Sequence, residues 1–158
     1  MLLVAPENFL LFAPLLPEAA SGTIEPRHAV IPLREMLRRT QLLVGQVTGI
    51  DLDARTAVAE DLTGARHELS WDQLVLSPGS MPSVIAVPGL VDHAVGFKTL
   101  PDAIWLRNRV LRQLETADAT VDPQRRRELL TFTFVGGGYA GVEALAEMES
   151  LVSDALPT

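Results

Sequence analysis

Three glycines, Gly136, Gly138 and Gly141, lie between an apolar run and a helical pattern, and they match the spacing G-x-G-x-x-G. After a strand and before a helix, this spacing is typical of a dinucleotide-binding turn. The first glycine allows the tight turn, the second lets the backbone approach a diphosphate, and the third lets helix and strand pack closely. Unpaired N–H groups at the helix start favour the phosphate charge. The alternative is a glycine-rich turn without a ligand in an unrelated α/β protein.

The strand and the helix that this motif requires are both predicted on either side of it. Residues 131–135 are β-branched and aromatic, which favours a strand. Apolar residues then recur with helical spacing from about Ala140 to Ala155. The acid that binds the ribose in such a unit lies roughly 20 residues after the glycines. That position falls near residue 158, so we expect half of a βαβ unit.

Before the motif, the apolar pattern has a period of two between about residues 42 and 77, which predicts a β-meander. We expect tight turns at 53–55 and 63–64. We expect strands at 42–44, 47–52, 56–61, 66–70 and 73–77, the last of them buried and ending at a Pro-Gly turn.

Four further segments have signals of their own. Residues 1–4 indicate a short buried strand, and 9–20 a loop or short helix, because two prolines interrupt it. Pro32 suits the first turn of a helix that runs to about Arg39. Thr99 is a helix cap, followed by a proline and an acid in the first turn of a helix to about residue 117. Residues 118–128 are polar and indicate a connector with one helical turn.

Composition excludes several classes of function. The 158 residues, one domain or parts of two by length, carry a net charge of −7 with no basic cluster, which argues against nucleic-acid binding. The sequence has no cysteine, which excludes a disulfide, a thiol nucleophile and a Cys-ligated zinc within it. Its three histidines are scattered, so no metal site is expected. Neither a membrane helix nor a signal peptide is expected from the apolar runs.

Several segments, in a fixed order along the chain, carry a resemblance to a known family. The sequence resembles the flavoprotein NAD(P)H oxidoreductases with two dinucleotide-binding domains, and most closely the type II, non-proton-pumping NADH dehydrogenases. Of the segments given below, only 136–143 is a specific motif by itself. The segments are residues 8–22 (NFLLFAPLLPEAASG), 72–80 (DQLVLSPGS), 97–100 (FKTL) and 136–143 (GGGYAGVE).

The resemblance implies an α/β chain with part of an FAD/NAD(P)-binding Rossmann-like fold and an inserted β-meander, incomplete at both ends. Residues 1–98 would be part of the FAD-binding domain, including the meander at 42–77. Residues 99–158 would begin the NADH-binding domain. The family's first G-x-G-x-x-G, which binds the FAD diphosphate, has no counterpart in this sequence. We therefore expect an internal fragment that is inactive by itself.

The resemblance also implies contacts with FAD. Pro14, Leu15 and Leu16 match the loop that lines the flavin ring, although a core role for these leucines is the alternative. Val47 matches a position whose backbone contacts the adenine of FAD. The turn made by Ser77, Pro78 and Gly79 matches one that closes over FAD, with Pro78 in place of the usual Thr.

NADH is the second cofactor that the resemblance implies. Gly136, Gly138, Tyr139, Ala140 and Gly141 match the turn that holds the NADH diphosphate. Glu143 matches an acid near the junction of nicotinamide and flavin, and it is the candidate catalytic residue. Its alternative role is a glutamate in the first turn of a helix, where the dipole stabilises any acid.

The activity implied is hydride transfer from NADH to flavin, followed by electron transfer to a quinone or another small acceptor. The expected location is cytoplasmic, with the full-length protein peripheral on the inner face of the cell membrane through parts absent from this sequence. A ferredoxin-reductase-like NAD(P)H flavoprotein and a non-catalytic truncated fragment are the alternatives. The lack of cysteine disfavours disulfide reductases and sulfide:quinone oxidoreductases.

Overall fold

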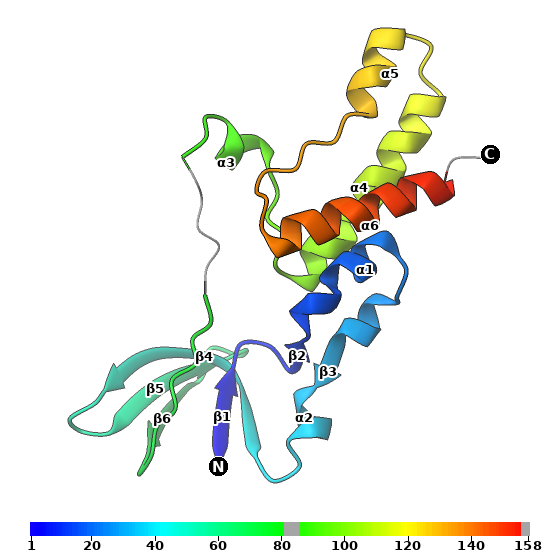
Figure 1. The fold of residues 1–158 in the computed structure, drawn as a ribbon. Helices are drawn as coiled ribbons and strands as arrows, with labels where there is room; N and C mark the ends of the chain where they lie inside the picture. The colour runs from blue at the N-terminus through cyan, green and yellow to red at the C-terminus, as the bar shows by residue number, and fades with distance from the viewer. Residues whose placement is uncertain (81–85, 156–158) are drawn as a thin grey trace. The chain divides into compact units, whose positions relative to one another are not determined.

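The computed structural model describes residues 1–80 and 86–155, and the chain is α/β (Figure 1). It divides into two compact units. The first unit comprises Met1–Leu10 and Ile31–Met81, and the second comprises Leu11–Val30 and Pro82–Thr158. The end of the chain, near which the ribose-binding acid is expected, lies outside the described residues.

The first unit is built on a four-stranded sheet with the order β1-β4-β5-β6. The short strand β1 (Leu2–Ala5) pairs in parallel with β4 (Gln41–Asp51). The strands β5 (Thr56–Asp61) and β6 (Arg66–Ser70) then follow in antiparallel order. The predicted meander, a strand at the start of the chain and the α/β class are therefore confirmed. The expected burial of that first strand is wrong, because none of its residues is buried.

The strand β4 corrects one prediction, because residues 42–44 and 47–52 do not form separate strands. They belong to one strand, whose register shifts between Val47 and Gly49. A bulge of this kind bends a strand without ending it. The change of apolar pattern near residue 47 therefore corresponds to the bulge and not to the end of a strand.

Aspartate side chains close both hairpin turns of the meander. Asp51 Oδ1 accepts hydrogen bonds from the N–H groups of Asp53 (3.0 Å) and Ala54 (2.8 Å). In the second turn Asp61 accepts from the Thr63 hydroxyl (2.6 Å), and its other oxygen lies 2.8 Å from His67 Nε2. The Thr63 hydroxyl, His67 and the Thr63 N–H together hold the pKa of Asp61 well below its usual range.

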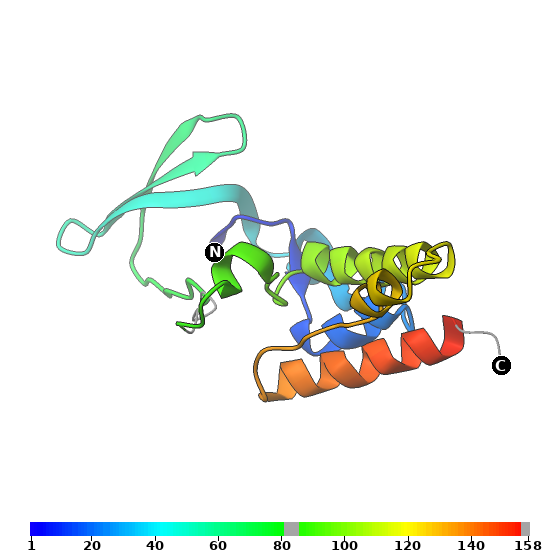
Figure 2. The ribbon, with the colours of Figure 1, turned by 90° about the horizontal axis from the view of Figure 1, so that it is seen from above.

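The second unit is helical, and Figure 2 shows its helices from above. Leu16, Ala20, Ala103, Val110 and Met148 form its buried core. Small alanines let α1 approach both α4 and α6. The helices are α1 (Leu16–Ser21), α3 (Leu90–His93), α4 (Leu100–Asp118), α5 (Pro123–Leu129) and α6 (Tyr139–Ala155), with 3₁₀ turns η1 (Ala13–Leu15) and η2 (Pro26–Ala29).

The predicted start of α4 is confirmed in atomic detail. Thr99 Oγ1 accepts from the Asp102 N–H (3.3 Å), and Asp102 Oδ2 accepts from the N–H groups of Thr99 (2.8 Å) and Lys98 (3.0 Å). This reciprocal pattern is a capping box. Burial would raise the pKa of Asp102, but the backbone N–H groups of Thr99 and Lys98 outweigh it and lower that pKa.

Two predicted strands are wrong. Residues 73–77 form no strand and are not buried: Val75 is 89% exposed, and Leu74 and Leu76 are also exposed. Residues 131–135 form no strand either, although Phe132 and Phe134 still pack against the helical core. In both segments the side chains favour an extended backbone, but no neighbouring strand of the described sheets pairs with it.

Two smaller elements differ from their predictions in extent. Residues 9–20 contain a strand, β2 (Phe9–Leu11), which pairs with β3 (Val30–Pro32), before the 3₁₀ turn and α1. The helix expected from Pro32 to Arg39 is the short α2 (Leu33–Met36), and Pro32 is its N-cap. Leu33 alone is buried there, so packing stabilises little more than one turn.

Candidate functional site

The glycine turn before α6 brings its first and last glycines together. Gly136 has a φ of +115°, a conformation that side chains rarely adopt. A Cβ on Gly141 would lie 2.5 Å from the Gly136 carbonyl oxygen, which leaves no room for a side chain. The Gly138 carbonyl accepts the first hydrogen bonds of the helix, from the N–H groups of Gly141 (3.0 Å) and Val142 (3.1 Å). The φ of Gly136 thus fits the role expected of it in the tight turn, and the crowding at Gly141 fits its role in close packing.

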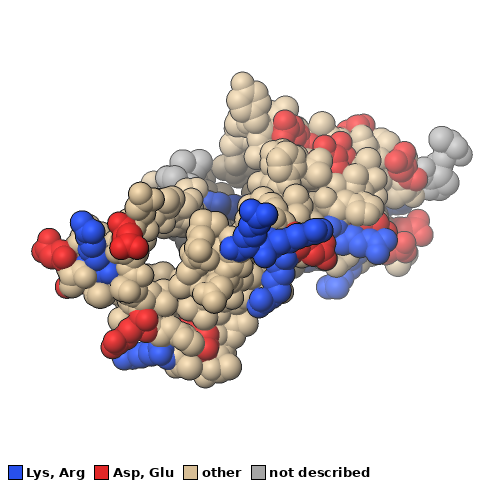
Figure 3. Space-filling view, turned by 90° about the horizontal axis from the view of Figure 1, so that it is seen from below, with Lys and Arg blue, Asp and Glu red and all other residues tan. Residues whose placement is uncertain are grey.

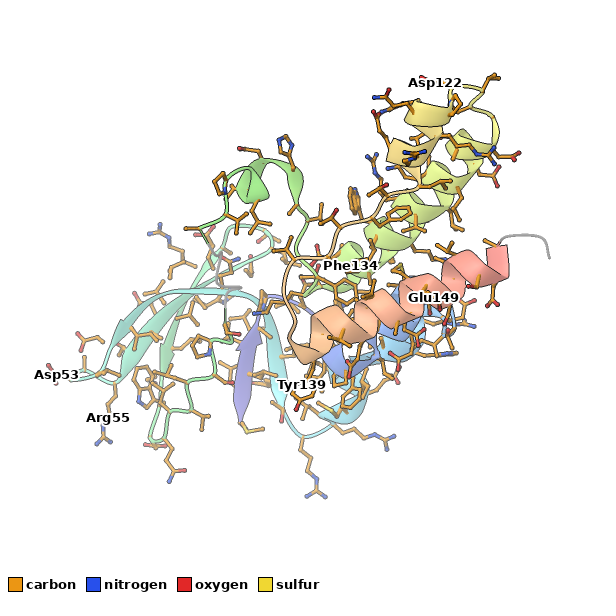
Figure 4. The ribbon with its side chains drawn as sticks, turned by 45° about the horizontal axis from the view of Figure 1, so that its top comes forward. Asp53, Arg55, Asp122, Phe134, Tyr139 and Glu149 are labelled. Carbon is orange, nitrogen blue, oxygen red and sulfur yellow. The ribbon has the colours of Figure 1, made fainter. Side chains whose placement is uncertain are left out.

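The surroundings of Gly138 are open, as are those of Gly136 and Gly137. A Cβ built there would meet nothing within 4 Å in this chain. The backbone at this position is therefore accessible to a diphosphate from solvent. Tyr139 and Ala140 follow at the helix start; both are exposed, and the Tyr139 side chain extends away from the helix (Figure 4).

The start of α6 also suits an anion. The helix has 17 residues, and its first turn contains no acid. The partial positive charge of the unpaired N–H groups is therefore not offset by a carboxylate in that turn. Glu143 is the fifth residue of the helix and is exposed, so it stands beyond the turn in which a glutamate acts as a helix-start acid. These residues fit the diphosphate of a dinucleotide.

The segment that precedes the turn is anchored by its aromatic side chains. Phe132 and Phe134 pack against the helical core, whereas Thr131, Thr133 and Val135 are exposed. Figure 4 shows Phe134 beside the helices of this unit. The side chains of residues 131–135 therefore alternate between exposed and partly buried, as in a strand, although the backbone makes no strand pairing.

The residues matched to the flavin-lining loop have different degrees of exposure. Pro14 and Leu15 lie in η1, where Pro14 is exposed and Leu15 half-buried. Leu16 begins α1 and is 3% exposed as part of the helical core. Flavin contact by these residues stays a prediction. Leu16 serves the core in any case, and the half-buried Leu15 has surface left for a ligand.

The other residues matched to FAD lie in the first unit. Val47 is on β4 beside the bulge and is partly exposed. Ser77, Pro78 and Gly79 form an exposed, irregular segment, in which Gly79 has a φ of +76°. Their contact with FAD also stays a prediction.

A hollow of about 210 Å³ is lined by Gln46 and Thr48, the residues that precede and follow Val47 in the sequence. It opens where the paired part of β1 and β4 ends, since Pro6 follows β1 and Gly45 follows the pairing of Val44 with Ala5. Nucleotides bind outside the carboxyl ends of parallel strands in α/β sheets. The sequence did not single out Gln46 and Thr48, which flank Val47 and line this hollow. A larger, shallow hollow of about 510 Å³ is lined by Leu2, Thr40 and His67 among others, and it contains none of the predicted site residues.

The described part of the chain shows no other kind of centre. Its histidine, aspartate and glutamate side chains form no group of three that could hold a metal ion. Within the same residues, no helix is both long enough and apolar enough to span a bilayer. Lys and Arg side chains share the face drawn in Figure 3 with Asp and Glu.

Comparison with known proteins assigns the chain to a family. The family model described as pyridine nucleotide-disulphide oxidoreductase matches residues 1–156. The chain belongs to this family.

The relatives within this family extend well beyond the matched region. The chain is 37% identical to the type II NADH:quinone oxidoreductase Ndh of Mycobacterium tuberculosis, over 98% of its own length and 34% of that protein. It is 36% identical to an external alternative NADH-ubiquinone oxidoreductase of Yarrowia lipolytica, over 99% and 28% of the two chains. It therefore spans about a third of the length of these relatives. The resemblance to type II NADH dehydrogenases is confirmed.

A solved structure agrees with this assignment. The structure of NDH2 from Plasmodium falciparum in complex with NADH superimposes with a TM-score of 0.88 at 25% identity. The match covers 98% of this chain and 32% of that one. The predicted Rossmann-like α/β fold with an inserted meander is thus confirmed. Despite the family's name, these 158 residues contain no cysteine, so the redox disulfide of some members cannot form within them.

Proposed function

We propose that this chain supplies the NADH-binding turn and part of the FAD-binding surface of a type II NADH:quinone oxidoreductase. The observation that carries the proposal is the open backbone at Gly138, at the start of a helix without an acid in its first turn. The relatives that reduce quinones with NADH support the same assignment.

Each part of the turn has a role in holding NADH. The N–H groups at the start of α6, around Tyr139 and Ala140, would donate hydrogen bonds to the diphosphate. Gly138 would let the phosphates approach the backbone. Gly136 and Gly141 would fix the angle at which α6 leaves the turn. Since these groups belong to the backbone, the site is formed before the cofactor arrives.

FAD and NADH are the cofactors in this proposal, and bound FAD would supply the redox chemistry between NADH and a quinone. Pro14, Leu15 and Leu16 would form an apolar wall that excludes water from the ring system. Val47 would contact the adenine of FAD through its backbone, and the segment from Ser77 to Gly79 would close over the cofactor. The carboxylate oxygens of Glu143 would accept a hydrogen bond or a proton where nicotinamide and flavin meet.

The proposal also covers the cellular location of the protein and the activity of these 158 residues by themselves. We infer a cytoplasmic protein that reaches the quinone pool by peripheral contact with the inner face of the cell membrane. We also infer that these 158 residues alone complete no catalytic cycle. They contain one G-x-G-x-x-G for two dinucleotides.

A chimera tests the proposal. This chain would replace the matched third of the Mycobacterium tuberculosis relative, and FAD content and NADH-dependent quinone reduction would be measured. We expect a flavoprotein that reduces quinone. The matched variant is Gly138→Asp, which keeps a favourable helix cap but places a side chain and a negative charge against the diphosphate.

The Gly138→Asp chimera should retain FAD and lose NADH-dependent reduction by tenfold or more, because charge-assisted hydrogen bonds contribute about 1.5–3 kcal/mol. A chimera that binds FAD but is not reduced by NADH would contradict the proposal. Equal rates for the two chimeras would show that the turn does not hold NADH.

A further inference from the structure

A hydrogen-bonded bridge joins α1 to α6 in the second unit. Ser21 Oγ lies 2.6 Å from Glu147 Oε2, and Thr23 Oγ1 lies 3.2 Å from the same oxygen. Ser21 is 8% exposed and Glu147 is half-buried. The bridge therefore links residues 126 positions apart in the sequence, and its Ser21–Glu147 bond is partly buried.

The contact distances indicate which group receives the Ser21 proton. A hydroxyl carries a single proton, and Ser21 Oγ has three acceptors in reach: Glu147 Oε2 at 2.6 Å, Thr23 Oγ1 at 2.8 Å and the Glu18 carbonyl at 3.0 Å. The short contact with a carboxylate is the stronger, charge-assisted one. The Thr23 hydroxyl can donate to the same oxygen. Glu147 thus accepts from Ser21 at the end of α1, and this contact restrains the rotation of α6 about its own axis.

That rotation determines the direction of Glu143. Residues four apart lie on the same face of a helix, so Glu143 stands one turn before Glu147 on the bridged face. The helices α1 and α6 pack side by side and run in the same general direction (Figures 1 and 2). Going back one turn on α6 therefore leads from Ser21 toward the start of α1, where Leu16 and η1 lie.

We propose that Glu147 is a positioning residue, which through Ser21 holds α6 so that Glu143 faces the segment Pro14–Leu16. This inference rests on the proposed function, in which Glu143 and that segment meet at the cofactors. Glu147 acts through Glu143 and needs no contact with either cofactor. The bridge would keep the NADH-binding helix and the flavin-lining loop in register.

The test uses the 158-residue chain without cofactors. Ser21→Ala removes the stronger donor without a change of charge. The two readouts are the ¹³C signal of the Glu143 carboxyl group and amide hydrogen exchange across Leu16–Ser21. The matched control is Ser153→Ala, which breaks a similar bond, Ser153 Oγ to Glu149 Oε1 at 3.1 Å, that lies within α6 and does not reach α1.

We expect Ser21→Ala to move the Glu143 signal and to speed exchange in α1 about tenfold, as the loss of a charge-assisted hydrogen bond predicts. Glu147→Gln keeps an acceptor oxygen and should change exchange less than Glu147→Ala. Ser153→Ala should change neither readout. If Ser21→Ala does not fold, Thr23→Val should give a smaller shift in the same direction.

An unchanged Glu143 signal in the folded variant would overturn the proposal, and so would an equal shift in Ser153→Ala. Because no NADH or flavin is added, this result is independent of the chimera test. If Ser21→Ala breaks the bridge and does not affect Glu143, the positioning role is refuted, and NADH binding is still tested by the chimera. If the chimera fails, the proposed function is refuted, and the bridge between Ser21 and Glu147 is unaffected by that result.

Discussion

Replacing Gly141 by alanine tests the geometry of the glycine turn through the sign of a stability change. A Cβ at this position would lie 2.5 Å from the Gly136 carbonyl oxygen, against 3.4 Å for ordinary contact. The shortfall, 3.4 − 2.5 = 0.9 Å, must be taken up by backbone, because the blocking atom is a main-chain oxygen. Gly136, which carries this oxygen, has a φ of +115°.

Two opposing effects determine the size of the change. Alanine in a helix is favoured over glycine by about 0.8–1.0 kcal/mol. Overpacking that displaces backbone costs about 1–3 kcal/mol. If the close approach is real, we expect a net loss of up to about 2 kcal/mol in the free energy of unfolding. If it is absent, the same substitution stabilises the chain by about 1 kcal/mol.

Urea unfolding followed by Trp105 fluorescence measures this change, since Trp105 lies on α4 in the same unit. A Trp71→Phe background removes the signal of the other unit. Gly137→Ala is the matched control, because a Cβ at Gly137 meets nothing within 4 Å. It should leave stability unchanged or raise it slightly. A Gly141→Ala chain as stable as this control would refute the close packing of the turn.

Three further predictions concern the N-cap of α4, the pH dependence of stability and the retention of FAD. Thr99→Ala should cost about 1 kcal/mol of stability, because it removes the capping box of α4; thermal unfolding measures it, and an unchanged midpoint would count against the cap. The folded-state pKa values of Asp61 and Asp102 lie below the unfolded value of about 3.9, so both groups stabilise the fold fully above about pH 5 and lose that contribution as the pH falls. Urea midpoints at a series of pH values should therefore fall on acidification, and less steeply in Asp61→Asn; equal slopes would contradict the role of that carboxylate. Finally, the purified chain should not retain FAD, since it has no second glycine turn for the FAD diphosphate; a yellow protein after gel filtration would show this to be wrong.

Local chemistry made part of this fold predictable. The aspartates that close the hairpins, the Thr99 cap and the glycines before α6 act on backbone groups within a few residues, so their effect is visible in the sequence. The bulge in β4 was not predicted, since it depends on how β5 pairs with it.

Pairing between distant segments accounts for the errors. Residues 73–77 and 131–135 have side chains that favour strands, but a strand also needs a neighbour, which the sequence of the segment itself does not encode. The bridge from Ser21 to Glu147 was missed for the same reason, because a serine and a glutamate 126 residues apart carry no local signal. The glycine turn was recognisable because its spacing is local, whereas the hollow lined by Gln46 and Thr48 depends on how the strands of the sheet pair.

The central claim is that the turn from Gly136 to Gly141 holds the NADH diphosphate, and amide NMR of the chain during an NADH titration tests it most directly. We expect the N–H signals of Gly138, Tyr139 and Ala140 to shift and saturate, and the shifts to be lost in Gly138→Asp while α6 remains folded. Amide signals at the start of α6 that stay in place, while NADH shifts signals elsewhere, would contradict the account.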